Sequence, residues 1–341
     1  MNRKFWLLAL IVAVSVFSFV ACSNNSGNPK EPSGNSNNLL DKHPATPLPG
    51  DASSNTGTTD QTLRIGLMSD VGAIPFMYAS EQGFFKDAGL NVEMTVFKSA
   101  MDRDTALQTG NLDGVMADTL TIIFYNNAGF DAKMTSNTYG KYDMITRSQL
   151  TLEEALQLSK LKVGISSNTV IDFVTDQIVT DLSIKNKTEK IAIPQMPVRL
   201  EMLKNGELDA ATMPDPLASA AVLDGGVMIS GTEEMNLYPG VFIFATKSIN
   251  DKQAEIAKFY QVYNETMEKL NGIPVDTYYD MLQDKLGFPP ILKGNFTVPK
   301  FQPAKAADEH TYDQVLEWMQ VKKLTDSDFT YAEMTDNRFV K

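Results

Sequence analysis

From residue 62 onwards, short apolar runs alternate with segments whose apolar residues recur every three or four positions. The runs have the length of strands and the periodic segments the length of helices. Buried parallel sheets produce this alternation, because helices cover both of their faces. We therefore expect an α/β fold, with strands at residues 62–68, 91–97, 132–137, 142–147, 161–165, 190–193 and 241–246.

One phrase occurs twice. Segments 107–113 and 203–209 each end a helical pattern with a glycine and continue with Leu-Asp and a short apolar run. Gly110 and Gly206 lie 206 − 110 = 96 positions apart. The glycine would end a helix, and the run predicts a buried strand, whose carboxyl end is where α/β sheets bind ligands. Two copies predict two similar lobes facing a cleft; the alternative is that a common helix-to-strand pattern recurs by chance.

The predicted helices complete this picture. Those in the C-terminal third are amphipathic, and we expect them to pack on the outside of the first lobe. The strand 241–246 would return the chain to that lobe. The helices are expected at residues 74–82, 100–109, 119–128, 152–158, 170–182, 217–223, 251–270, 275–286 and 309–321.

The N-terminus has the pattern of a secretory signal. A short basic start precedes the apolar stretch 5–20, which is too short for a helix that stays in a membrane. Cys22 follows and is the only cysteine, so no intramolecular disulfide can form. Phe19-Val20-Ala21-Cys22 resembles the bacterial lipobox, in which the cysteine is lipidated. We expect residues 1–21 to be a lipoprotein signal peptide and Cys22 an anchor; the alternative is a secreted protein with a free thiol.

Residues 22–61 are rich in Ser, Asn, Gly, Pro and Thr and contain few large apolar side chains. Such a segment cannot offset the entropy cost of ordering, so we expect a flexible linker after the anchor. The remaining residues, 62–341, are enough for two lobes with their own cores. The formal net charge of −12 argues against nucleic acid or anionic lipid as a partner.

Two motifs resemble a known family. In residues 76–93 a helix ends in Gly83-Phe84-Phe85 and a strand begins with Gly89-Leu90-Asn91-Val92. This stretch looks like the signature of solute-binding proteins for nitrate, sulfonate, taurine and thiamine-precursor ABC importers. Met213-Pro214-Asp215-Pro216-Leu217 is similar to the Pro-acidic-Pro loop of that family, and the similarity covers about residues 62–249.

The resemblance implies a type II periplasmic-binding-protein fold, in which two lobes enclose a ligand cleft. Lobe 1 would comprise residues 62–147 plus 241–341, and lobe 2 residues 148–240. The hinges would lie near Arg147 and near residues 238–240.

Loops at the predicted strand ends provide the candidate ligand-binding residues. Several of them begin helices, whose free N–H groups bind oxyanions. Carboxylates at Asp70, Asp118 and Asp215 instead favour a ligand with an amine, an amidine-like ring or several N–H donors. Helix capping is the alternative role for Asp118 and Asp215. The expected ligand contacts are Asp70, Gly72, Phe76, Ser99, Asp118, Thr119, Asn137, Ser167, Asn168, Thr169, Asp215 and Tyr238.

Other roles remain open for three of the larger side chains. Phe76 and Tyr238 could stack on a flat heterocycle, but core packing for Phe76 and packing at the crossover for Tyr238 are the alternatives. Arg199 is a possible partner for an anion, but it lies inside a predicted helix, where we expect it to be solvated.

The sequence lacks the common motifs for phosphate-loop, zinc-protease and serine-hydrolase chemistry. We therefore expect no catalytic residue, metal or cofactor. The expected function is that of a monomeric, lipid-anchored protein on the outer face of a bacterial membrane. It would capture a small polar solute and deliver it to an ABC permease and its ATPase, touching the membrane only through the anchor. The alternative is a lipoprotein sensor or adhesin with the same fold.

Overall fold

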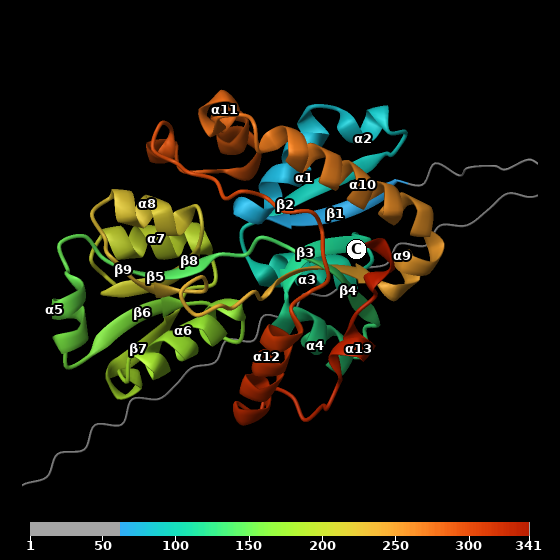
Figure 1. The fold of residues 1–341 in the computed structure, drawn as a ribbon. Helices are drawn as coiled ribbons and strands as arrows, with labels where there is room; N and C mark the ends of the chain where they lie inside the picture. The colour runs from blue at the N-terminus through green and yellow to red at the C-terminus, as the bar shows by residue number, and fades with distance from the viewer. Residues whose placement is uncertain (1–61, 341) are drawn as a thin grey trace, which may run out of the picture. The chain divides into compact units, whose positions relative to one another are not determined.

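The computed structural model describes residues 62–340, in which the strands form two five-stranded sheets (Figure 1). The first sheet has the order β2-β1-β3-β10-β4, with β1 (Leu63–Met68), β2 (Val92–Phe97), β3 (Gly114–Asp118), β4 (Ala132–Asn137) and β10 (Gly240–Ala245). The second has the order β7-β6-β8-β5-β9, with β5 (Tyr142–Thr146), β6 (Leu161–Ile165), β7 (Thr188–Ala192), β8 (Ala210–Pro214) and β9 (Met228–Gly231). The predicted two-lobed α/β fold is confirmed. The predicted signal peptide, Cys22 and the predicted linker lie outside the described residues.

The two sheets are built alike. In the first, β1 pairs in parallel with β2 and β3, whereas β10 is antiparallel to both β3 and β4. In the second, β6 pairs in parallel with β7 and β8, whereas β5 is antiparallel to both β8 and β9. The repeated phrase thus leads into equivalent strands, β3 and β8, and the repeat is structural.

Helices pack on both faces of each sheet (Figure 1). The helices of the second lobe are α5 (Leu152–Gln157), α6 (Val170–Asp181), α7 (Met196–Lys204) and α8 (Leu217–Leu223), with the turn η2 (Lys185–Lys187). The first lobe begins with η1 (Val71–Ala73), α1 (Ile74–Glu81), α2 (Phe84–Asp87), α3 (Ala100–Gln108) and α4 (Thr119–Asn127). Its C-terminal elements are α9 (Thr246–Asp251), α10 (Gln253–Leu270), η3 (Val275–Thr277), α11 (Tyr279–Met281), η4 (Leu282–Leu286), η5 (Pro290–Leu292), α12 (Glu309–Val321), α13 (Tyr331–Met334) and η6 (Asn337–Phe339). None of the helices within residues 62–340 is long and apolar enough to cross a membrane.

Strand β10 shows why an unbroken apolar run forms a central strand. Phe242 and Phe244 are fully buried on the face covered by α1 and α10. Val241 and Ile243 are fully buried on the opposite face, with α4 and α12. Successive side chains of a strand point to opposite faces, so a strand with helices on both sides needs apolar residues throughout.

Strand β5 corrects the expected position of the first crossing between the lobes. The predicted lobe boundary puts residues 142–147 in lobe 1, but β5 pairs with β8 and β9 in the second sheet, with Tyr142 opposite Pro214. The chain therefore crosses before Tyr142, not near Arg147. The pattern of a buried strand is the same in either sheet, so it does not reveal which one the strand joins.

The predicted continuous helix 275–286 is also wrong, because the segment is broken into short pieces. It consists of the short pieces η3, α11 and η4, because Tyr278 has a non-helical backbone (φ −122°, ψ 10°) between the first two. The neighbouring Tyr279 is fully buried, and its hydroxyl donates to the Pro289 carbonyl oxygen at 2.7 Å. Anchoring this side chain in the core interrupts the helix.

Helix α12 contacts both lobes, whereas we expected it to pack on the first lobe alone. It packs on α4 in the first lobe, while Trp318 Nε1 donates to Asp176 Oδ2 of α6 at 3.1 Å. Lys322 Nζ lies 2.9 Å from the same carboxylate, and Lys190 of β7 lies 2.5 Å from its other oxygen. The buried Asp176 thus joins the C-terminal third to the second lobe.

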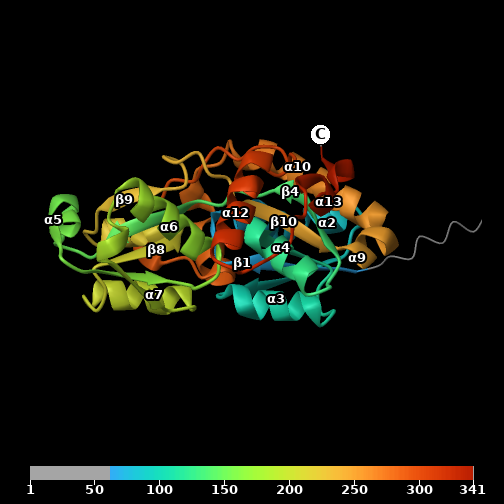
Figure 2. The same ribbon diagram turned by 90° about the horizontal axis from the view of Figure 1, so that it is seen from below.

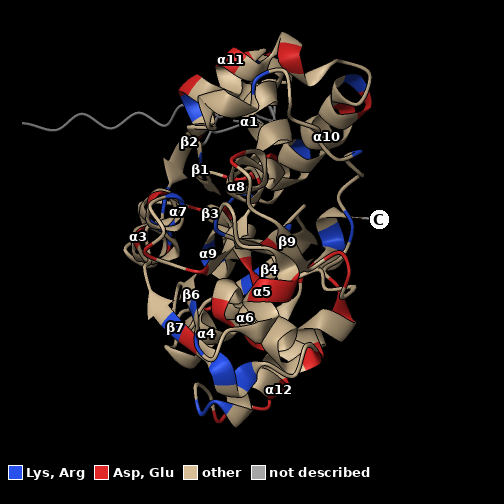
Figure 3. Cartoon of the chain, turned by 90° about the vertical axis from the view of Figure 1, so that its left-hand side faces the viewer, with Lys and Arg blue, Asp and Glu red and all other residues tan. Residues whose placement is uncertain are grey.

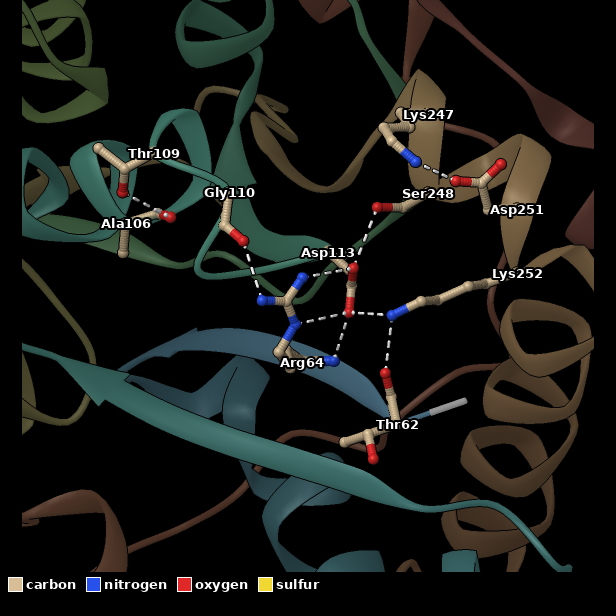
Figure 4. A network of polar contacts seen from close by, with 10 residues as sticks. All are labelled: Thr62, Arg64, Ala106, Thr109, Gly110, Asp113, Lys247, Ser248, Asp251 and Lys252. Atoms are coloured by element: carbon tan, nitrogen blue, oxygen red, sulfur yellow. Dashed lines mark hydrogen bonds and ion pairs between the residues drawn. The ribbon is translucent and has the colours of Figure 1, made fainter. Parts of the chain in front are cut away.

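The aspartate of the repeated phrase fixes each strand to its neighbour, as Figure 4 shows for Asp113 in the first copy. Asp113 Oδ2 accepts from the Arg64 backbone N–H and from Lys252 Nζ, both at 2.8 Å, and Oδ1 accepts from Ser248 Oγ at 3.2 Å. Although burial opposes it, the hydrogen bonds from Arg64 and Lys252 hold the pKa of Asp113 below its ordinary value. The second copy is simpler: Asp209 Oδ2 accepts from the Lys162 backbone N–H at 2.9 Å.

Replacement of the two aspartates by alanine should therefore have unequal effects. Asp113→Ala leaves the Arg64 backbone N–H without its acceptor and the charges of Arg64 and Lys252 with only the Gly110 and Thr62 carbonyl oxygens, so it should lower the free energy of unfolding by about 3 kcal/mol. Asp209→Ala removes one backbone hydrogen bond and should cost about 1 kcal/mol. Urea unfolding of both variants tests this, and equal losses would contradict the role of the Asp113 network.

Candidate functional site

Strand ends from both lobes surround a small cavity of about 40 Å³, which we call the central cavity. The first lobe contributes Asp70 after β1, Asp118 at the end of β3, and Arg103 of α3. The second lobe contributes Tyr142 of β5 and Thr169 before α6. This is the edge at which α/β sheets bind ligands, so the repeat leads in both lobes to the same site.

A larger cavity of about 400 Å³, the outer cavity, adjoins the central one, because Ala100, Ser166 and Thr169 line both. It lies beside α3, and α7, the equivalent helix of the second copy, lies in line with α3 on the same side of the molecule (Figures 2 and 3). Gln195 before α7 donates from Nε2 to Asp102 Oδ2 of α3 at 3.4 Å. The two lobes therefore touch beside the opening.

Asp70 is held by the turn that it begins. Its extended backbone (φ −144°, ψ 177°) lets Oδ1 accept from the Gly72 N–H at 2.8 Å, which caps η1. Burial raises the pKa of this carboxyl to about 7, and the nearby charge of Asp215 adds to the effect, against the backbone hydrogen bonds and Arg103. A carboxyl that changes charge near neutral pH thus lines the central cavity.

Asp118 caps α4, which is the alternative role that the sequence suggested beside ligand contact. Its Oδ1 accepts from Thr121 N at 3.0 Å and from Thr121 Oγ1 at 3.1 Å. Burial raises its pKa, although the charge of Arg103 and the capping bonds oppose the shift. Capping uses only Oδ1, so Oδ2 of the same side chain can still accept a hydrogen bond from a ligand in the cavity.

Arg103 supplies a positive charge at the cavity wall, and sequence reasoning missed it. It is 2% exposed, and its guanidinium lies 2.7 Å from Asp104 Oδ1, 3.2 Å from the Met116 carbonyl oxygen and 3.0 Å from Thr121 Oγ1. Burial lowers its pKa, but the charges of Asp104 and Asp118 and the hydrogen bond to Asp104 outweigh that effect and raise it. Arg103 is therefore permanently charged.

Arg199 is the equivalent of Arg103 in the second copy, because 199 − 103 = 96, the spacing of the repeat. It is fully buried, so the expectation that it is solvated is wrong. It donates to the carbonyl oxygens of Thr212 at 2.8 Å and Ile193 at 3.1 Å, and to Ser166 Oγ. Burial lowers its pKa to about 9. The repeat spacing was the signal that could have linked these two arginines as equivalent residues.

The predicted ligand contacts are divided among three cavities. Asp70, Asp118 and Thr169 line the central cavity, and Ser99, Ser167 and Thr169 line the outer one. Asn137 and Tyr238 line a third cavity of about 160 Å³, formed largely by the two segments that connect the sheets. The central cavity thus collects only part of the predicted set.

Three more of these residues support the loops behind the cavity wall. The Gly72 N–H bonds to Asp70, and Thr119 donates from N and Oγ1 to the Pro239 carbonyl oxygen at 2.9 and 3.2 Å. The Asp215 carbonyl oxygen accepts from Val71 N at 3.1 Å, and its Oδ1 accepts from Ser219 N at 3.0 Å. Asp215 therefore joins the lobes and caps the start of α8.

The remaining two residues point elsewhere. Phe76 is 2% exposed and stacks on Tyr263 and Phe259, with ring centroids 4.5 and 5.1 Å away, so its ring belongs to the core, as the alternative role for it proposed. Asn168 is exposed and its N–H donates to Asp172 Oδ2 at 3.0 Å. Its φ of 58° shows that it turns the chain into α6. Among the described residues, no group of three or more His, Cys, Asp or Glu side chains could hold a metal ion.

A family model described as the NMT1-like family matches residues 56–262, which is more than half of the 341 residues. The chain belongs to the NMT1-like family. The match includes both copies of the repeat and the whole second lobe, and it confirms the relationship indicated by the motifs at residues 76–93 and 213–217. No curated protein matches this NMT1-like chain.

Solved structures share the fold of this NMT1-like protein. The ligand-binding component of an ABC-type import system from Staphylococcus aureus is 13% identical, with a TM-score of 0.66 over 82% of this chain and 97% of that one. The periplasmic aliphatic sulphonate binding protein SsuA from Escherichia coli is 15% identical, with a TM-score of 0.64 over 81% and 92%. The desulfurization enzyme DSZB is 14% identical, with a TM-score of 0.59 over 82% and 97%. At these identities the likeness shows the fold alone.

The raised pKa of Asp70 predicts a pH-dependent cost to stability. Unfolded, this carboxyl ionises near pH 4, but folded it holds its proton to about pH 7. Its contribution to stability therefore falls as the pH rises from about 4 to about 7 and is constant above. Asp70→Asn keeps an acceptor for Gly72 but carries no charge, so its stability relative to wild type should increase by on the order of 2 kcal/mol from pH 5 to pH 8. Urea unfolding at both pH values measures this; an advantage that is equal at both would contradict the raised pKa.

Proposed function

We propose that this protein is an extracytoplasmic solute-binding lipoprotein that captures a small polar solute and delivers it to an ABC permease and its ATPase. The observation that carries the proposal is the central cavity, whose wall comes from equivalent strand ends of two lobes. A solute in it contacts Asp70 and Asp118 on one side and Tyr142 and Thr169 on the other. Binding would therefore hold the lobes together.

The arrangement of the lobes supports capture and release. The chain crosses between the sheets at residues 138–141 and again at 232–239. A solute bound at about 1 μM contributes about −8 kcal/mol, which is enough to shift a two-state equilibrium strongly if it contacts both lobes. The closed form would then be the signal that a permease recognises, as the family resemblance implies.

Binding fits the side chains of the cavity better than catalysis does. The residues lining the central cavity in the described structure include neither histidine nor cysteine, and His310 lies in α12. The enzyme DSZB shares the fold, but fold alone does not transfer an activity. The proposed ligand classes are those that the family resemblance suggests: a sulfonate-, taurine- or nitrate-like solute, or a thiamine-pyrimidine-like one.

A panel of candidate solutes tests the function directly. Residues 62–341 should show a higher melting temperature with at least one of taurine, alkanesulfonates, nitrate or aminopyrimidines, because a ligand at 100 times its Kd stabilises by about 2.7 kcal/mol. Salt solutions of equal ionic strength are the control. If no compound in the panel raises the melting temperature, the proposed solute classes are wrong.

The lipid anchor is tested separately. Cys22→Ala should move the protein from the membrane fraction to the soluble fraction, because Cys22 is the only cysteine that could carry the lipid. Immunoblots of the two fractions measure the change. Membrane association that survives the substitution would refute the anchor.

A further inference from the structure

The first-lobe wall of the central cavity presents two carboxylate oxygens that are not used within the described structure. Asp70 uses Oδ1 for Gly72, and Asp118 uses Oδ1 for Thr121. The Oδ2 atom of each accepts no hydrogen bond from any residue in 62–340. Both side chains are buried, at 8% and 3% exposed. Neither oxygen is among the fully buried side-chain atoms of residues 62–340 that lack a partner, so each is open to the cavity and can accept a hydrogen bond from a ligand.

Tyr142 gives an independent indication from the other lobe. This side chain is 7% exposed and lines the central cavity, yet its hydroxyl makes no hydrogen bond within the described part of the chain. Tyr142, Asp70 and Asp118 line the same cavity of about 40 Å³. Burial raises the pKa of the Tyr142 hydroxyl, and the charges of Asp70 and Asp118 raise it further against that of Arg103. A third polar group therefore faces the same space without a partner.

The charges around the cavity favour a cation. Arg103 is the one positively charged side chain among the described residues that line the central cavity, and its nearest partner is Asp104 at 2.7 Å. Asp70 and Asp118 remain, so the carboxylates outnumber the guanidinium. Arg199 does not correct this balance, because its donors are bound to the Thr212 and Ile193 carbonyl oxygens and to Ser166. Where these carboxyls are ionised, an oxyanion beside them would meet like charges at short range, whereas a cation would favour their ionised forms and so lower their raised pKa values.

We propose that the central cavity binds the positively charged end of a solute, a primary ammonium or an amidinium group, between Asp70 and Asp118. An ammonium group has three N–H donors, which match Asp70 Oδ2, Asp118 Oδ2 and the Tyr142 hydroxyl oxygen. An anionic group on the same solute would lie away from these carboxylates. The inference rests on the proposed function and narrows its ligand to cationic or zwitterionic compounds.

Three compounds with the same two-carbon skeleton separate the alternatives. Ethanolamine carries only the ammonium group, isethionate only the sulfonate, and taurine both. Thermal unfolding of the full-length protein in mild detergent, with each compound at about 10 mM, should show a rise of about 2–4 °C with ethanolamine and with taurine. Isethionate at equal ionic strength should produce no rise.

Variants locate the effect in the cavity. Asp118→Asn keeps the helix cap, because asparagine caps as well as aspartate, but removes the charge, so it should abolish most of the rise with ethanolamine. Tyr142→Phe keeps the ring and removes the third acceptor, so it should reduce the rise by about half. Asp87→Asn removes one charge from an exposed position on α2 and should leave the rise unchanged. Each rise is measured from the melting temperature of the same variant without ligand.

The outcomes distinguish this inference from the proposed function. A rise with isethionate as large as that with ethanolamine, or one retained in Asp118→Asn, would overturn the cationic site while leaving solute capture standing. The absence of a rise with both ethanolamine and taurine would also overturn it. If the wider solute panel then fails as well, the proposed function falls with it.

Discussion

The fold depends on one contact that occurs in both lobes: an aspartate side chain that accepts from the backbone of the neighbouring parallel strand. Asp113 binds the Arg64 N–H, and Asp209 binds the Lys162 N–H. In return, the aspartate N–H groups donate to the Arg64 and Lys162 carbonyl oxygens at 2.8 and 3.0 Å. These paired bonds fix the register of β3 against β1 and of β8 against β6. Since the strands are short, fixing their start also fixes where their carboxyl ends open onto the cavity.

The sequence was sufficient for the parts of the fold that depend on local pattern. β6 and α8 lie where expected, and β10 differs by one residue at each end, because buried runs and helical spacing are properties of neighbouring residues. Long-range choices were not visible. The pattern of β5 fits either sheet, and the interruption at Tyr278 depends on where Tyr279 finds its partner. Strand β9 has four residues, which is too short for a pattern to stand out.

The site was harder to predict because its chemistry depends on burial. Asp70 and Asp118 could be identified as strand-end carboxylates, but their roles as caps and as cavity walls coexist in one side chain. The burial of Arg103 and Arg199 could not be predicted, since it depends on contacts outside their own helices: each donates to a carbonyl oxygen 13 residues further along the chain. Polar side chains on helices are normally expected to face solvent. Only the 96-residue spacing links the two arginines, and it indicates related positions without revealing that they are buried.

The repeat also shows how two similar lobes came to offer different chemistry. In the first lobe, Arg103 is paired with Asp104, and the cavity wall adds Asp70 and Asp118. In the second, Arg199 is bound by neutral oxygens, and the wall offers Tyr142, Ser166 and Thr169. Burying the carboxylates of the first lobe costs stability, because their ionised forms lose hydration. A solute that donates to these carboxylates and contacts the neutral second wall would recover that cost only when both lobes surround it, so recognition and closure would depend on the same groups.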